Sequence, residues 1–142
     1  MAHFYLGWTY IQEANFQKAS ELFQKAYSLS GRDPRIKSWL GYTNALMGNR
    51  KEALQILDEL MELQARQYVD PSFIALIYLG LDDKDQTFKW LNIGYMERSF
   101  WLVWLDVDPG FDRIRPDKRF EALHQNMKFD SISNPISKTQ KR

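Results

Sequence analysis

The sequence contains no cysteine, only two histidines and no long apolar run. The absence of cysteine excludes disulfides, thiolate metal sites and a cysteine nucleophile. No 18 consecutive residues are apolar, so the sequence contains no candidate transmembrane helix. Basic residues number 19 and acidic residues 18, which gives a net charge of +1. Because nucleic-acid-binding domains carry a basic face, we expect neither a membrane nor a nucleic acid as partner.

Motifs that carry catalytic or metal chemistry are also missing. The 7 glycines are scattered and form no phosphate-binding loop. Neither His3 nor His124 is followed by a histidine or a carboxylate three or four residues later, the spacing of a helical metal pair. Asp106, Asp108 and Asp112 alternate, but the glycine and glutamate of a calcium loop are not at the required positions. We therefore expect no catalytic residue, no metal, no cofactor and no enzymatic activity.

Aromatic residues are abundant: 9 Phe, 7 Tyr and 5 Trp make up 15% of the 142 residues. With 44% hydrophobic and 26% charged residues, the composition is that of one folded domain rather than a disordered chain. The N-terminal residues lack the basic stretch and apolar core of a signal peptide. A cytoplasmic location is the resulting default expectation.

A period of 34 residues relates three segments of the first hundred residues, without any insertion. Apolar residues at helical spacing predict two helices in each copy, separated by an N-cap residue. Between copies, an Asp-Pro pair predicts the start of the next helix. The residues that recur are Leu6, Gly7, Tyr10, Asn15, Ala19, Phe23 and Ala26, then Leu40, Gly41, Asn44, Asn49, Ala53, Leu57 and Leu60, then Ile74, Ala75, Tyr78, Asp83, Thr87, Leu91 and Gly94.

This pattern resembles the tetratricopeptide repeat, whose first helix carries Leu-Gly and then Tyr, and whose second helix carries Ala, an aromatic residue and Ala. The third copy departs most, since Thr87 and Gly94 replace the usual alanines. The resemblance implies an all-α right-handed solenoid of three helix pairs, at about 1–33, 34–67 and 68–98. It also implies a protein–protein interaction module, because such repeats bind protein or peptide partners.

Residues after Arg98 do not follow the period, and we expect capping helices over 99–128 and a flexible tail over 129–142. The segment from Ser99 to Leu105 is too apolar for a solvated loop, which predicts a short helix lying on the last repeat. Residues 100–120 are similar to the end of tetratricopeptide regions in bacterial and archaeal signalling proteins, such as winged-helix regulators, adenylate cyclases and kinases. This similarity suggests that the chain is the C-terminal part of a longer protein.

In the solenoid that the resemblance implies, the first helix of each pair lines a concave groove. Six half-exposed aromatic rings there would expose roughly 450–750 Å², more than monomers usually leave open in one patch. Four occupants remain open: a partner peptide, upstream repeats, the chain's own Phe100–Leu105 segment, or a second copy of the protein. The expected partner-binding residues are Phe4, Tyr5, Trp8, Gln12, Arg35, Trp39, Tyr42 and Phe73.

Two functional hypotheses follow. The first is an interaction module that binds a peptide or a partner protein in the concave aromatic groove. The alternative is a C-terminal regulatory or oligomerisation domain of a larger signalling protein, of the transcription-regulator or adenylate-cyclase type. A homo-oligomer formed through the aromatic groove is a further expectation.

Overall fold

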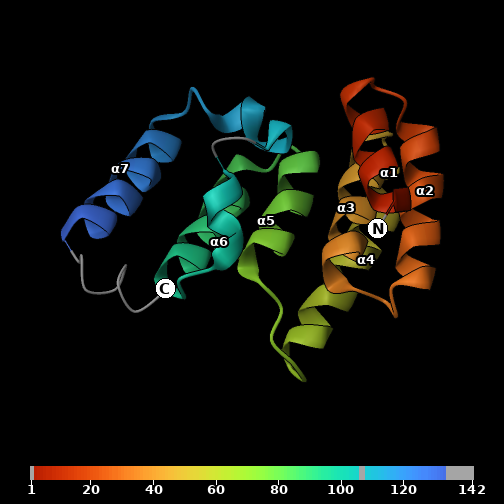
Figure 1. The fold of residues 1–142 in the computed structure, drawn as a ribbon, viewed down its shortest axis with the longest axis horizontal. Coiled ribbons are helices and arrows are strands. Elements are labelled where there is room, and N and C mark those ends of the chain that lie inside the picture. Colours follow the sequence, from red (N-terminus) through yellow and green to blue (C-terminus); the bar gives the residue numbers. More distant parts are fainter. Residues whose placement is uncertain (1, 106–107, 134–142) are drawn as a thin grey trace.

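The computed structural model describes residues 2–105 and 108–133. These residues form α-helices and two short 3-10 helices, and none of them lies in a strand. The elements are coloured along the chain in Figure 1. In chain order they are α1 (Ala2–Gln12), α2 (Phe16–Leu29), α3 (Pro34–Leu46), α4 (Arg50–Gln64), α5 (Pro71–Gly80), α6 (Lys84–Met96), η1 (Phe100–Trp104), η2 (Pro109–Ile114) and α7 (Lys118–Ser133).

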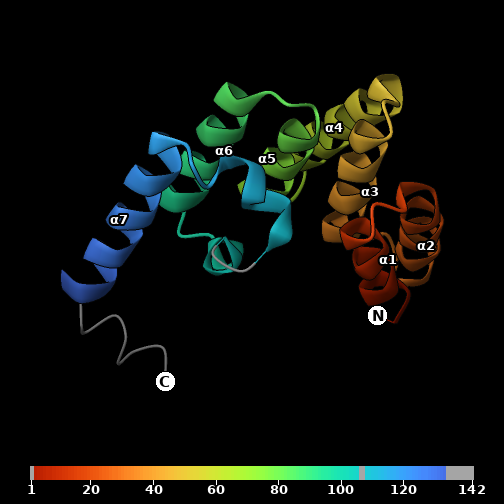
Figure 2. The ribbon, with the colours of Figure 1, turned by 90° about the horizontal axis from the view of Figure 1, so that it is seen from above.

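Successive helices pack as three pairs: α1 with α2, α3 with α4, and α5 with α6. Helix α3 joins the pairs, because it packs on α2 on one side and on α5 on the other. Figures 1 and 2 show the pairs following one another across the molecule, with α7 at the end opposite α1. The prediction of an all-α, tetratricopeptide-like superhelix of helix pairs is confirmed.

The 34-residue period is visible in the backbone of the turns inside each pair. The residue before each N-cap has a positive φ, of 58° at Ala14, 82° at Gly48 and 61° at Asp82. A backbone hydrogen bond of the same kind then closes each turn, from the N–H of the cap to the C=O five residues earlier. These bonds join Asn15 to Tyr10 at 2.9 Å, Asn49 to Asn44 at 2.9 Å and Asp83 to Tyr78 at 3.0 Å.

The predicted N-caps form in two of the three pairs. The side chains of Asn15 and Asp83 accept a hydrogen bond from the backbone N–H three residues later. Asn49 makes no such bond, and its Nδ2 instead donates to Asn44 Oδ1 at 3.3 Å. Only the middle pair has an asparagine five residues before its cap, so the amide of Asn49 has a side-chain acceptor there.

The C-terminal part differs from the expectation in two respects. The turn-rich segment before Pro116 contains a second short helix, η2, which the sequence did not predict. Helix α7 extends to Ser133, past the boundary expected at residue 128. Residues 129–133 are therefore helical rather than part of a tail, and the rest of the expected tail lies outside the described residues.

Candidate functional site

Three of the predicted groove residues are buried. Phe4, Trp39 and Tyr42 are only 8%, 6% and 5% exposed. The expectation that these aromatic side chains stand half-exposed is therefore wrong. Of the other five, Tyr5 is 60% exposed and Gln12 is also exposed. The remaining three, Trp8, Arg35 and Phe73, are half-buried.

The chain's own C-terminal segment lies on Trp39, one of the buried aromatic residues. The backbone of Gly110 in η2 lies so close that a Cβ there would be 3.5 Å from Trp39 Cη2 and 3.4 Å from Leu76 Cδ1. Arg113, also in η2, donates a hydrogen bond from Nη1 to the C=O of Leu79 at 3.5 Å. These contacts come from η2 and not from the Phe100–Leu105 segment that the sequence offered as one of four possible occupants.

Two apolar pairs anchor this segment in the core. Leu102 and Leu105 are 3% and 2% exposed, and Phe111 and Ile114 are 5% and 0% exposed. All four belong to the same buried cluster as Phe4, Trp39 and Tyr42. Burying one such side chain stabilises by about 1.5–3 kcal/mol, so the four together contribute roughly 6–12 kcal/mol before entropy is counted.

A continuous row of aromatic rings and one guanidinium joins α1 to η1. Tyr5 contacts Phe4 edge-on, with ring centroids 5.6 Å apart. Arg35 Cζ lies 4.9 Å from the Phe4 ring and 5.1 Å from the Trp101 ring, between the two. Trp101 in turn contacts Phe100 edge-on at 5.6 Å. We call these five residues the aromatic row; its two ends are exposed, Tyr5 at 60% and Phe100 at 67%.

A buried carboxylate holds the start of η1 on the start of α5. Asp70, 4% exposed, accepts hydrogen bonds from the backbone N–H of Ser72 at 2.9 Å and from its hydroxyl at 2.7 Å. It also accepts from the Ser99 hydroxyl, whose Oγ lies 2.7 Å and 2.6 Å from its two carboxylate oxygens. Ser99 in turn caps η1 by accepting from the N–H of Trp101. One carboxylate thus caps α5 and orients η1; we call η1 and η2 together the covering segment.

Arg115 ties the two short helices to each other. Its guanidinium donates to the C=O of Leu105 at 2.6 Å and to the C=O of Asp108 at 2.9 Å. Its Nε also donates to the Asp112 carboxylate at 2.8 Å. Burial raises the pKa of the Asp108 carboxyl, while the N–H of Gly110 and the charge of Arg115 oppose that shift. Leu105, at the end of η1, and Asp108, at the start of η2, are thereby bonded to the same arginine.

The phenolic hydroxyl of Tyr42 lies within reach of the charges on the covering segment. Burial raises the pKa of Tyr42, and Arg113 opposes that shift while Asp108 and Asp112 reinforce it. These three charged residues all belong to η2 or its cap. Tyr42 is only 5% exposed, so its ring is not available to a partner in this arrangement.

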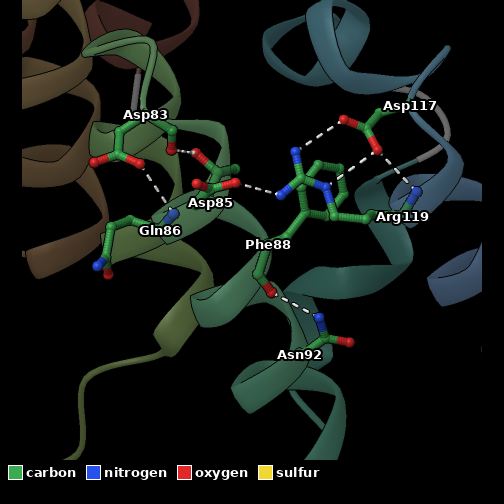
Figure 3. A network of polar contacts seen from close by, with 8 residues as sticks. Asp83, Asp85, Gln86, Phe88, Asn92, Asp117 and Arg119 are labelled. Carbon is green, nitrogen blue, oxygen red and sulfur yellow. Dashed lines mark hydrogen bonds and ion pairs between the residues drawn. The ribbon is translucent and has the colours of Figure 1, made fainter.

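Helix α7 is held to α6 by a polar network (Figure 3). Arg119 Nη1 lies 2.6 Å from Asp85 Oδ1, and its Nη2 lies 3.0 Å from Asp117 Oδ2. The guanidinium also lies over the Phe88 ring, 4.6 Å from its centroid. Hydrogen bonds from Arg119 lower the pKa of Asp117, and the same contacts raise the pKa of Arg119.

The sequence contains a signal for the covering segment that the 34-residue period does not capture. Leu102 and Leu105 are three residues apart, as are Phe111 and Ile114. In a 3-10 helix, side chains three residues apart lie on the same side. Each pair follows a side chain that caps a helix start, Ser99 for η1 and Asp108 for η2.

Residues 10–71 match the family model described as tetratricopeptide repeat. The match runs from the end of α1 to the start of α5. This match supports the assignment of tetratricopeptide repeats. Such repeats are non-catalytic and generally mediate protein–protein interaction. No curated protein and no solved structure matches the chain. None of the helices in the described residues is long and apolar enough to cross a membrane.

Proposed function

We propose that the protein is a protein–protein interaction module whose partner binds at the aromatic row with η1 and η2 in place. The observation that carries this proposal is the exposure of the two ends of the row, Tyr5 and Phe100, at 60% and 67%. Val103, three residues after Phe100 on η1, is also 60% exposed. Each exposed aromatic ring leaves roughly 90–170 Å² of surface open, so a partner meets an apolar contact at each end of the row.

The energetics favour a partner that leaves the covering segment where it is. A peptide that entered the groove beneath η1 and η2 would have to replace the four anchoring side chains, which contribute roughly 6–12 kcal/mol. A micromolar complex has only about 8 kcal/mol of binding free energy in total. The buried predicted residues, Phe4, Trp39 and Tyr42, therefore support the binding surface rather than contact the partner.

The expected partner is a protein segment with an aromatic or aliphatic anchor. Aromatic residues and arginine are the residue types that dominate binding energy at protein interfaces, and the row presents both. Trp8 and Gln12 lie on the same face of α1 as Tyr5, at helical spacing, and extend the surface along that helix.

To test this proposal, peptides that bind the purified protein are selected from a displayed library. The dissociation constant of a selected peptide is then measured by calorimetry. We expect Tyr5→Ala and Phe100→Ala to weaken the selected peptide at least tenfold. Leu29→Ala is the matched control, since Leu29 is 73% exposed on α2 and lies outside the row. If both row variants bound as tightly as the unmodified protein, the proposed surface would be wrong.

A further inference from the structure

A pocket of about 350 Å³ lies between the C-terminal ends of α4 and α6 and the loop that joins α4 to α5. Its lining residues include Gln64 from α4, Tyr68 from the loop, and Trp90 and Glu97 from α6 and its C-cap. Ligand pockets measure about 300–1,000 Å³, so this one is small and suits a group of the size of one side chain. None of the described residues that line it belongs to the aromatic row.

Two aromatic residues give the pocket a surface that attracts cations. Tyr68 is 66% exposed, whereas Trp90 is half-buried and packs against the core. The face of an aromatic ring carries partial negative charge, so it attracts a cation within about 6 Å of the ring centre, and Trp does so most strongly. The core contacts of Trp90 hold one ring in place, while Tyr68 remains accessible to a ligand.

The charges at the pocket are negative. Among the described residues, those that line the pocket include Glu97 but no Lys or Arg, and no salt bridge within the same ranges involves Glu97. Burial raises the pKa of the Tyr68 hydroxyl, and the charges of Asp70 and Glu97 reinforce that shift. Asp70 already accepts hydrogen bonds from Ser72 and Ser99. We therefore expect a ligand to bond to Glu97 and to interact with Asp70 through its charge.

Two helix ends add to this negative potential. The last C=O groups of a helix carry about half a negative charge, which favours a cation nearby. Helix α4 ends at Gln64 and α6 at Met96, and neither has a basic residue in its last turn. The next basic residues along the chain are outside the pocket lining, because Arg66 lines a neighbouring groove beside α3 and Arg98 is exposed. A bound cation would supply the positive charge that both helix ends lack.

We propose that this pocket binds an organic cation, a guanidinium or an ammonium group, with Glu97 as its counter-ion and the rings of Tyr68 and Trp90 against it. The cation belongs to a basic side chain of a polypeptide or to a small methylated ammonium compound, since both present the same chemistry. An anionic ligand would be repelled by Glu97, and an apolar one would cover that carboxylate without giving it a partner.

NMR titration of the full chain with N-acetyl-arginine amide, at constant ionic strength, tests the proposal. We expect saturable shifts of the Trp90 indole N–H and of the backbone N–H groups of Tyr68 and Glu97 at millimolar concentrations. The citrulline analogue has nearly the same shape but no charge, so it should bind at least tenfold more weakly.

Two further probes identify the source of the cation, a Gly-Gly-Arg-Gly-Gly peptide and tetramethylammonium. Tighter binding of the peptide indicates a polypeptide side chain, and tighter binding of tetramethylammonium indicates a methylated small molecule. Either order supports the site, because both probes carry the cation that the pocket is proposed to bind.

Substitutions at exposed positions test the two components separately, with the circular dichroism spectrum unchanged. Glu97→Gln should weaken the arginine probe about fivefold and leave the citrulline probe unaffected. Tyr68→Ala should weaken the arginine probe about threefold, whereas Tyr68→Phe keeps the ring and should keep the affinity. Glu13→Gln is the matched control, because Glu13 is exposed beside α1 and lies outside the pocket.

Equal affinity for the arginine and citrulline probes would overturn the proposal. Shifts that map outside the pocket, or no binding of any cationic probe, would do the same. Tyr5→Ala and Phe100→Ala should leave binding of the arginine probe unchanged, so a failure here is separate from a failure of the aromatic row.

Discussion

Replacing Asp70 with alanine should destabilise the protein far more than an ordinary N-cap substitution does. The change removes the cap of α5, and losing such a cap costs about 1 kcal/mol. It also leaves the Ser99 hydroxyl, in a residue 8% exposed, without its carboxylate acceptor. A buried polar group deprived of its partner costs about 1–3 kcal/mol. We therefore expect a total loss of about 2–4 kcal/mol in the free energy of unfolding.

Asp33→Ala is the matched control, because Asp33 caps α3 in the same Asp-Pro context. Its carboxylate accepts from the N–H of Arg35 at 2.8 Å, and it forms an ion pair with the same residue at 3.7 Å. Both contacts are local, and exposed ion pairs contribute about 0–1 kcal/mol. Asp33→Ala should cost about 1 kcal/mol, and the excess for Asp70→Ala then measures the bond to the covering segment.

Urea unfolding gives the two free energies, and a cycle with Ser99→Ala isolates the coupling. The coupling between Asp70 and Ser99 should be about 1–2 kcal/mol, within the range for residues in direct contact. A 142-residue domain loses about 3–5 °C of Tm per kcal/mol, so Asp70→Ala should melt about 6–20 °C lower. Hydrogen exchange over residues 99–105 should accelerate as well. Equal costs for Asp70→Ala and Asp33→Ala would refute the reasoning.

Three other substitutions test separate features. Gly41→Ala should cost about 1–3 kcal/mol by urea unfolding, because its Cβ would lie 2.9 Å from Cδ1 of the fully buried Ile77. Gly48→Ala meets no atom within 4 Å but has a φ of 82°, so thermal unfolding should show a loss of about 1 kcal/mol. Arg119→Ala should speed hydrogen exchange in α7, and raised salt should do the same in the unmodified protein. Because Arg119 lowers the pKa of Asp117, the stabilisation that this pair gives α7 should be fully present above the pKa that Asp117 has in the unfolded chain. It should be lost as the pH falls through the lower pKa that Asp117 has in the folded protein. A variant that exchanges like the unmodified protein at all pH values would contradict this role.

The helix pairs were predictable because their determinants are local and repeated. The 34-residue period placed the first six helices, and the Asp-Pro pairs at Pro34 and Pro71 marked the starts of α3 and α5. Each of these signals lies within a few residues of the element it specifies. Asn49 is the exception, because its amide bonds to a side chain on the preceding helix instead of the backbone.

The burial of the groove was not predictable by the same means. Phe4, Trp39 and Tyr42 lie on the first helices of their pairs, as expected. The exposure of Trp39, however, depends on a segment far along the chain, which places Gly110 against its ring. That segment has no 34-residue equivalent, so no internal comparison reveals where it packs. Its apolar residues predict a short helix but not the surface on which the helix lies.

Three aromatic residues of the concave face, Phe4, Trp39 and Tyr42, are buried and are not available for binding. Aromatic residues that would be anchors for a partner in an open groove here form the core beneath η1 and η2. Their substitution by alanine should therefore act mainly through stability, at about 3–5 kcal/mol for a buried Phe or Trp. Substitution of the exposed Tyr5 should act mainly on binding. The exposed ends of the aromatic row thus separate the two roles, because they are the part of the row that a partner reaches without unfolding the C-terminal segment.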